Sequence, residues 1–92
     1  METRTLKFMP YAQARITEDE NTINLISYTT TVITIDKNTG WVICSGTYSQ
    51  TTRKHISSFC KEIECGLDYH LMKQIAADRV KYNIDTGEIV NL

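Results

Sequence analysis

A run of β-branched residues constrains this chain more than any other feature. Residues 29–35 read Thr-Thr-Thr-Val-Ile-Thr-Ile, and such side chains are favoured on a pleated strand. A cluster of turn-forming residues, 36–40, follows, and Trp-Val-Ile-Cys at 41–44 can return as a second strand. We therefore predict a β-hairpin within residues 22–48, with residues 22–27 extending its first strand toward the N-terminus.

The period of the apolar residues changes after this hairpin. Ile56, Phe59, Cys60 and Ile63 fall at i, i+3, i+4 and i+7, so they share one face of a helix over about residues 52–64. Hydroxyl residues just before it can accept hydrogen bonds from the free amides of its first turn. The apolar face needs cover, which the hairpin can provide.

A second helix is predicted over residues 69–78. Asp68 stands at its N-cap position, and residues 80–84 regain strand character. An Asp-Thr-Gly turn then leads into residues 88–91, so the segment 79–92 is expected to close the fold as a strand or small hairpin.

These elements predict one α+β domain over residues 1–92. Its architecture is an antiparallel sheet of three to five strands, with the two consecutive helices of residues 50–78 packed on one face. Residues 1–21 are expected to form an arm or edge strand and then a solvated acidic loop that contains residues 18–20, Glu-Asp-Glu. The alternative for that loop is an acidic patch that docks a basic partner.

Charge and hydropathy exclude several classes of protein. The chain has 10 basic and 11 acidic side chains and a formal net charge of −1, so no global field steers it toward nucleic acid, and it is too weakly acidic to imitate DNA. It has no apolar run long enough to span a membrane, and its N-terminus lacks the apolar centre of a signal peptide. We expect a soluble, cytoplasmic protein that does not engage a membrane.

The three cysteines do not point to a metal site. They form no Cys-x-x-Cys pair, as expected in a reducing compartment. His55, Cys60, Cys65 and His70 recur at intervals of five, which are zinc-ligand types at the wrong spacing, because five helical residues turn through about 140°. We expect no metal and no cofactor.

No catalytic motif is present in the sequence. The two histidines, His55 and His70, stand outside any known motif, and phosphate loops, nucleotide fingerprints and serine elbows are missing. His55 lies about 80° from the centre of its helix's apolar stripe, which predicts a residue at the edge of the core. The protein is not expected to be an enzyme.

The start of the first helix suggests binding to nucleic acid. Thr51, Arg53 and Lys54 place a hydroxyl, free amides and two cations together, which suits a phosphate, and Lys61 follows two turns later. The two helices also have the spacing of a helix-turn-helix. The residues facing nucleic acid would then be Tyr69, His70, Lys73 and Gln74. Interleaved acids oppose this hypothesis by repelling phosphates: Glu62, Glu64, Asp68 and Asp78.

Large aromatic residues suggest binding to a protein instead. Trp41 directly follows a turn, and a small domain cannot bury every ring that this chain carries, which makes Trp41 a candidate interface anchor. Tyr28 and Tyr48 are expected to pack in the core or on the sheet. An edge strand can also pair with its counterpart in a second copy, which would give a homodimer.

Five segments of the chain carry a resemblance to known proteins: Leu-Ile-Ser-Tyr-Thr-Thr-Thr-Val at 25–32, Gly-Trp-Val at 40–42, Ser-Gly-Thr-Tyr-Ser at 45–49, Thr-Thr-Arg-Lys-His-Ile at 51–56 and Tyr-Asn-Ile-Asp-Thr-Gly-Glu at 82–88. Over about residues 25–90 the sequence resembles small uncharacterised proteins of bacteriophages and mobile elements in gut and Gram-positive bacteria. This resemblance implies a genomic setting in which short accessory proteins often inhibit host defence systems by binding a defence protein, its nucleic acid or its signalling molecule.

We therefore expect an accessory protein that acts by stoichiometric binding in the cytoplasm of a bacterial host. Its expected partner is a bacterial protein of a defence system, such as a CRISPR-Cas effector. The alternative is a small nucleic-acid-binding regulator that uses the basic helix start at residues 51–54. Sequestration of a small nucleotide signal is a third hypothesis, which requires a pocket. The residues expected to contact the partner are Trp41, Thr51, Arg53, Lys54, Lys61, Tyr69 and Lys73.

Overall fold

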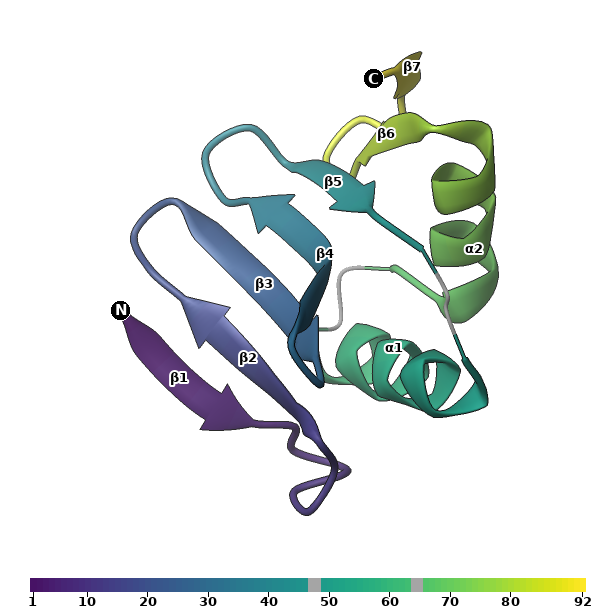
Figure 1. Ribbon diagram of the computed structural model, residues 1–92. Coiled ribbons are helices and arrows are strands. Elements are labelled where there is room, and N and C mark those ends of the chain that lie inside the picture. The colour runs from purple at the N-terminus through teal and green to yellow at the C-terminus, as the bar shows by residue number, and fades with distance from the viewer. Residues whose placement is uncertain (47–48, 64–65) are drawn as a thin grey trace.

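The computed structural model describes residues 1–46, 49–63 and 66–92, which form seven strands and two helices (Figure 1). In chain order the elements are β1 (Glu2–Thr5), β2 (Ala14–Glu18), β3 (Thr22–Ser27), β4 (Thr30–Asp36), β5 (Trp41–Cys44), α1 (Gln50–Ile63), α2 (Tyr69–Asp78), β6 (Val80–Asn83) and β7 (Ile89–Asn91).

The strands form a single antiparallel sheet in the order of the chain. Each strand from β1 to β7 pairs with the next one, and the two helices are inserted between β5 and β6. Both helices lie on the same side of the sheet, α1 against β3 and α2 against β5 and β6 (Figure 1). The predicted α+β fold, with an antiparallel sheet and two consecutive helices on one face, is confirmed.

The predicted number of three to five strands is wrong, because the sheet has seven. One of the additional strands arises because the segment predicted as the first strand of the hairpin forms two strands. Residues 22–27 form β3, and a tight turn at Tyr28 reverses the chain into β4. Tyr28 adopts a left-handed φ of 57°, a conformation that is uncommon for a residue other than glycine. The sequence carries no glycine or asparagine there to signal the turn. Residues 22–46 thus hold three strands in place of a two-stranded hairpin.

The N-terminal segment supplies the other two strands. β1 pairs with β2, and β2 pairs with β3, so residues 14–18 form a strand where a loop was expected. The alternation is visible in β2, where Ala14 and Ile16 are buried and Arg15 is exposed. Asp19 then makes the turn into β3, because its Oδ1 accepts hydrogen bonds from the amides of Asn21 and Thr22, both at 2.8 Å.

The apolar core fills the space between the sheet and the two helices. The predicted stripe of α1 is confirmed, since Ile56, Phe59 and Cys60 are buried and Ile63 is partly buried. Each such side chain contributes about 1.5 to 3 kcal/mol to folding when it is fully buried. The other core residues are Leu6, Ala14, Ile16, Leu25, Val32, Ile33, Ile35, Val42, Cys44, Leu67, Met72, Ile75 and Val80.

Side chains define where the helices begin and end. Ser49 caps α1, because its Oγ accepts a hydrogen bond from the Thr52 amide at 3.1 Å. The predicted cap of α2 is confirmed, since Asp68 Oδ1 accepts from the Leu71 amide at 2.7 Å. Arg79 ends α2 in a left-handed conformation with φ 53°. The predicted end of α1 at Glu64 lies outside the described residues, as do Tyr48 and Cys65.

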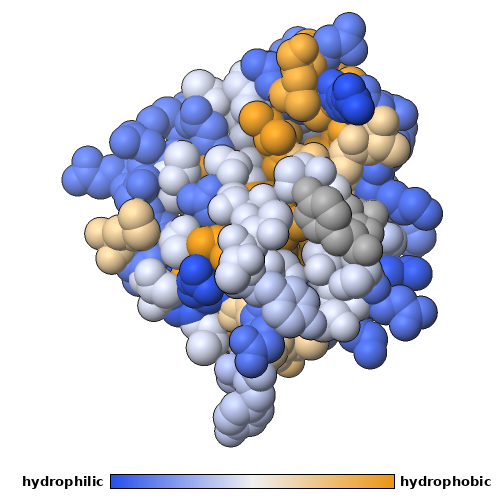
Figure 2. Space-filling view, in the orientation of Figure 1, coloured by the Kyte–Doolittle hydropathy of each residue, from blue (hydrophilic) through white to orange (hydrophobic). Residues whose placement is uncertain are grey.

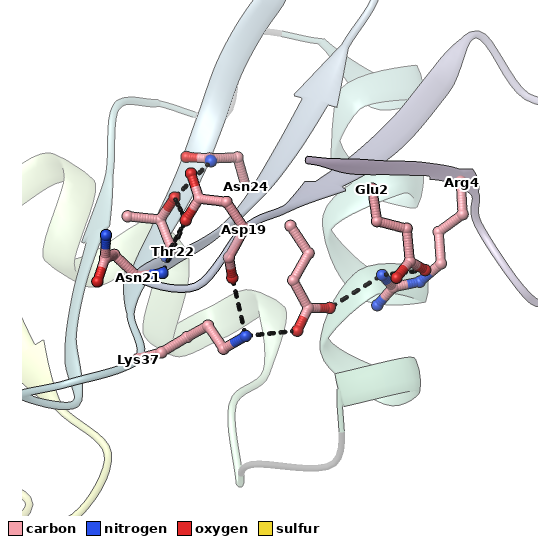
Figure 3. A network of polar contacts seen from close by, with 8 residues as sticks. Glu2, Arg4, Asp19, Asn21, Thr22, Asn24 and Lys37 are labelled. Carbon is pink, nitrogen blue, oxygen red and sulfur yellow. Dashed lines mark hydrogen bonds and ion pairs between the residues drawn. The ribbon is translucent and has the colours of Figure 1, made fainter.

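A polar network links β1, the end of β2 and the turn that follows β4 (Figure 3). Glu18 of β2 uses one carboxylate oxygen to bind Arg4 Nη1 at 3.0 Å and the other to bind Lys37 Nζ at 2.8 Å. The same Lys37 Nζ donates to the carbonyl oxygen of Asp19 at 2.9 Å. These hydrogen bonds from Lys37 and Arg4 lower the pKa of Glu18. Both carboxylate oxygens of Glu18 are thereby engaged within the fold.

Candidate functional site

Two adjoining hollows lie along the outward face of α1, and together they form the basic groove. The first has a volume of about 480 Å³, and the second, of about 350 Å³, lies between α1 and the start of α2. They share Arg53 and Ser57 as lining residues, so they adjoin at this part of α1. Met9, Gln50 and Lys54 complete the lining of the first, and Cys60, Lys61, Leu67, Asp68, Tyr69 and His70 complete that of the second.

The helical period explains why α1 offers this surface. Its apolar residues Ile56 and Phe59 face the sheet, so residues spaced by three or four on the other side face solvent. Lys54 and Lys61 are both exposed and stand seven positions apart, which places them two turns and roughly 10 Å from each other along the helix. The cations therefore form a row along the groove.

Two aromatic rings accompany these cations. The guanidinium carbon of Arg53 lies 4.7 Å from the centre of the Tyr69 ring. Phe8, in the β1–β2 loop, is 47% exposed, and its ring centre lies 4.6 Å from Lys61 Nζ and 5.4 Å from Lys7 Nζ. Each contact is a cation–π pair. The site thus combines positive charge with flat apolar surface.

Some of the acidic residues that would repel an anion make contacts within the fold. Glu62 is 11% exposed; its carboxylate accepts a hydrogen bond from the Lys7 amide at 2.6 Å and lies 3.7 Å from Arg4 Nε. Asp68 lines the second hollow, but one of its oxygens caps α2. Asp78 stands at the far end of α2, and Glu64 lies outside the described residues.

The structure gathers some of the predicted contact residues and separates others. Arg53, Lys54, Lys61 and Tyr69 all line the basic groove. The remaining three do not line either hollow. Thr51 is exposed in the first turn of α1, Lys73 is exposed on α2, and Trp41 lies in β5 with Lys81 Nζ 4.5 Å from its ring centre.

Trp41 belongs to the face of the sheet that the helices leave uncovered. Its neighbour Val42 is buried in the core, and successive side chains of a strand point to opposite faces. By the same alternation, Ile43 shares the face of Trp41, whereas Val42 and Cys44 face the core. Ile43 is 40% exposed. The Trp41 surface is therefore distinct from the basic groove.

A buried polar cluster that sequence reasoning missed joins β3 to α1. Ser27 Oγ lies 2.8 Å from Nδ1 of His55 and 3.1 Å from Oγ1 of Thr52. The expectation that His55 sits at the edge of the core is wrong, since it is 1% exposed, and this burial lowers its pKa. No local pattern relates Ser27 to a histidine 28 positions later, so only the fold reveals the pair.

This serine–histidine pair does not make an accessible nucleophile. Ser27 is 3% exposed, so a substrate cannot reach its hydroxyl without opening the contact between β3 and α1. The Tyr28 ring lies beside the imidazole of His55, and the two ring centres are 5.8 Å apart. The arrangement is suited to fixing the helix on the sheet.

Within residues 1–46, 49–63 and 66–92, no group of three or more histidine, cysteine, aspartate or glutamate side chains is arranged to hold a metal ion. Cys65, one of the four residues with zinc-ligand chemistry, lies outside that part. Across the same residues, neither helix has the length and apolar character needed to cross a membrane.

Comparisons with known proteins identify a family and no function. Searches of the curated proteins and of the solved structures returned no significant match. One family model matches residues 3–76, which run from β1 into α2 and include all the residues that line the basic groove. The chain therefore belongs to DUF8033, a family of unknown function.

Proposed function

We propose that the protein acts by stoichiometric binding, and that the basic groove takes a single-stranded nucleic acid. The observation that carries this proposal is the pairing of the groove's cations with aromatic rings. Arg53 lies over Tyr69, which also lines the groove, and Lys61 lies over Phe8, whose ring is outside the lining of both hollows. Proteins that bind single strands combine such cations, which contact phosphates, with rings on which bases stack.

The groove can make only a few ionic contacts with a nucleic acid. Arg53, Lys54 and Lys61 line it, and Lys7 lies next to Phe8 at its edge. Three or four phosphate contacts give modest affinity that falls steeply with salt, because each contact releases condensed counterions. Base stacking on the rings then has to supply much of the remaining affinity.

Burial of the Ser27–His55 pair supports binding in place of catalysis. The resemblance to phage and mobile-element proteins supplies the biological setting of the proposal. In that setting the protein inhibits a bacterial defence component, such as a CRISPR-Cas effector, by occupying the nucleic acid that the component carries or uses.

The uncovered face of the sheet supports a second candidate, binding to a protein. Trp41 is half-buried and Ile43 is exposed on this face, which is the kind of aromatic and aliphatic surface that anchors interfaces. An apolar area also lies over the C-terminal strands β6 and β7 (Figure 2), where Ile89 and Leu92 are exposed. Because β7 is an edge strand, a second copy could pair with it to form a homodimer.

Charge reversal distinguishes the two candidates. In the first, Arg53→Glu with Lys61→Glu abolishes binding of a labelled single-stranded oligonucleotide, measured by fluorescence anisotropy. Lys73→Glu with Lys81→Glu is the matched control, because it makes the same change in net charge outside the groove and keeps wild-type affinity. Equal affinity of the groove variant and the wild type would exclude the groove as the site.

Affinity purification from a bacterial lysate tests the biological setting. The tagged protein is purified with and without nuclease, and the co-eluting material is identified. The first candidate predicts a defence component whose recovery falls after nuclease treatment and after Arg53→Glu. A partner that resists nuclease and is lost with Trp41→Ala would instead establish the second candidate.

A further inference from the structure

We propose that the second hollow, between α1 and α2, is a binding site for one unpaired guanine base. This inference rests on the proposed function, because the same groove would hold the phosphates on either side of that base. It adds a preference among bases, which the rows of cations cannot provide, since phosphate contacts carry no sequence information.

The hollow has the size and lining of a small-ligand site. Its volume of about 350 Å³ lies at the lower end of the range for such pockets. Cys60 and Leu67 are buried side chains on its wall and offer apolar surface. Lys61 and Arg53 stand on the α1 side, where they can meet the phosphates of the bound nucleotide.

Arg53 and Tyr69 provide a surface for stacking. The guanidinium carbon lies over the Tyr69 ring, 4.7 Å from its centre. Unpaired bases stack both on aromatic rings and on the planes of arginine guanidinium groups. A base in the hollow therefore has both kinds of group available for stacking.

Asp68 supplies the chemical basis for a preference. Its Oδ1 caps α2 through the Leu71 amide, and its Oδ2 has no hydrogen-bond partner among the residues that the structure describes. An ionised carboxylate only accepts hydrogen bonds. Guanine presents two neighbouring donors, N1–H and N2–H₂, on its Watson–Crick edge, whereas adenine and cytosine place an acceptor beside their amino group and uracil places its one donor between two carbonyls.

Binding of four oligonucleotides tests the preference directly. Each is a short uridine strand whose central base is guanine, adenine, cytosine or uracil, and affinity is measured by fluorescence anisotropy. Guanine should bind on the order of ten-fold more tightly than the others, because its two donors can meet Oδ2 of Asp68 and the remaining lone pair of its Oδ1, and a bidentate pair gives discrimination of this order. Equal affinity for all four strands would overturn the inference and leave the proposed function intact.

Asp68→Asn isolates the carboxylate from the fold. Asparagine is also a good N-cap, so α2 should remain, which circular dichroism verifies. The variant is expected to lose the guanine preference, and its affinity for the uridine strand should not fall, because the substitution removes a negative charge that repels phosphates. Asp78→Asn removes an acid of the same helix outside the hollow and should keep the preference. Retention of the preference by Asp68→Asn would overturn the assignment.

Guanosine monophosphate distinguishes a free nucleotide from a base within a strand. If the ligand is a strand, the monophosphate should bind much more weakly than the guanine oligonucleotide. Binding of the monophosphate as tight as that of the oligonucleotide, and sensitive to Asp68→Asn, would support the guanine site but contradict the proposed function. Failure of every oligonucleotide and of the monophosphate to bind would overturn both.

Discussion

The hydroxyl oxygen of Ser27 lies 2.8 Å from Nδ1 of His55, deep between β3 and α1. Both residues are buried, so neither polar group can exchange this hydrogen bond for one with water. Thr52 Oγ1 extends the contact at 3.1 Å from Ser27 Oγ, and Ser49 Oγ continues it to the cap of α1. The helix that carries the basic groove is thereby fixed on the sheet through its inner, polar residues.

Removing the Ser27 hydroxyl should destabilise the protein. Ser27→Ala leaves the imidazole nitrogen of His55 buried without this partner, which costs about 1 to 3 kcal/mol of unfolding free energy. Urea denaturation followed by circular dichroism measures the loss. An unchanged denaturation midpoint would show that the contact contributes nothing to stability.

Ser58→Ala is the matched control on α1, with the opposite sign expected. Ser58 is buried, and its Oγ has no hydrogen-bond partner among the described residues. The substitution removes an unsatisfied hydroxyl and adds the best helix former. We expect unchanged or higher stability, by up to roughly 1 kcal/mol. A loss as large as that of Ser27→Ala would contradict the assignment of the polar cluster.

Stability should decline as the pH falls below about 6.5. Burial lowers the pKa of His55 below its ordinary value of 6.5. Between that value and the folded-state pKa, the unfolded chain binds more protons than the folded one, so the unfolding free energy falls as the pH falls. The lowered pKa values of Glu18 and Asp19 act only further down, from their ordinary values of 4.5 and 3.8.

His55→Asn tests the origin of this decline. The variant lacks the titrating ring, so its unfolding free energy should change less with pH below about 6.5 than that of the wild type. An equally steep profile in His55→Asn would place the titration elsewhere.

Glycine at position 79 should stabilise the end of α2. Arg79 is exposed and has a left-handed φ of 53°, which glycine adopts without the steric cost of a Cβ. Arg79→Gly should raise the unfolding free energy by about 1 kcal/mol, measured in urea. Arg79→Ala keeps the Cβ and should bring no gain, so equal gains in both variants would argue against relief of backbone strain.

Phe8 should contribute to nucleic-acid affinity without contributing much to stability. Phe8 is partly exposed beside Lys61, and base–aromatic stacking is worth about 1 to 3 kcal/mol per base. Phe8→Ala should weaken binding of a single strand by at least several-fold in anisotropy measurements. Tyr11→Ala removes a ring that is 98% exposed on the same loop, and it should bind like the wild type.

The elements with strong periodicity could be predicted from the sequence, and the others could not. The stripe of Ile56, Phe59 and Cys60 and the cap at Asp68 correctly indicated both helices. The turn at Tyr28 was missed because a left-handed tyrosine has no local signal. In residues 1–21 an arm or edge strand was predicted, and β1 lies at the sheet edge. β2 was missed because its alternation depends on only two apolar residues, Ala14 and Ile16.

Part of the candidate site could also be predicted from the sequence. The cations Arg53, Lys54 and Lys61 share a helix, so their common face follows from the helical period. Their contacts with Phe8 and Tyr69 come from distant segments, which only the folded chain brings together. The ion pair between Glu62 and Arg4 likewise depends on how β1 packs beside α1.

The salt dependence of single-strand binding tests the central claim most directly. The logarithm of the association constant is plotted against the logarithm of the salt concentration for the wild type and for Lys61→Ala. If three or four cations of the basic groove contact phosphates, the wild-type slope should be about −2 to −3, and Lys61→Ala should reduce its magnitude by about 0.7. A wild-type slope near zero, or an unchanged slope in Lys61→Ala, would contradict the account.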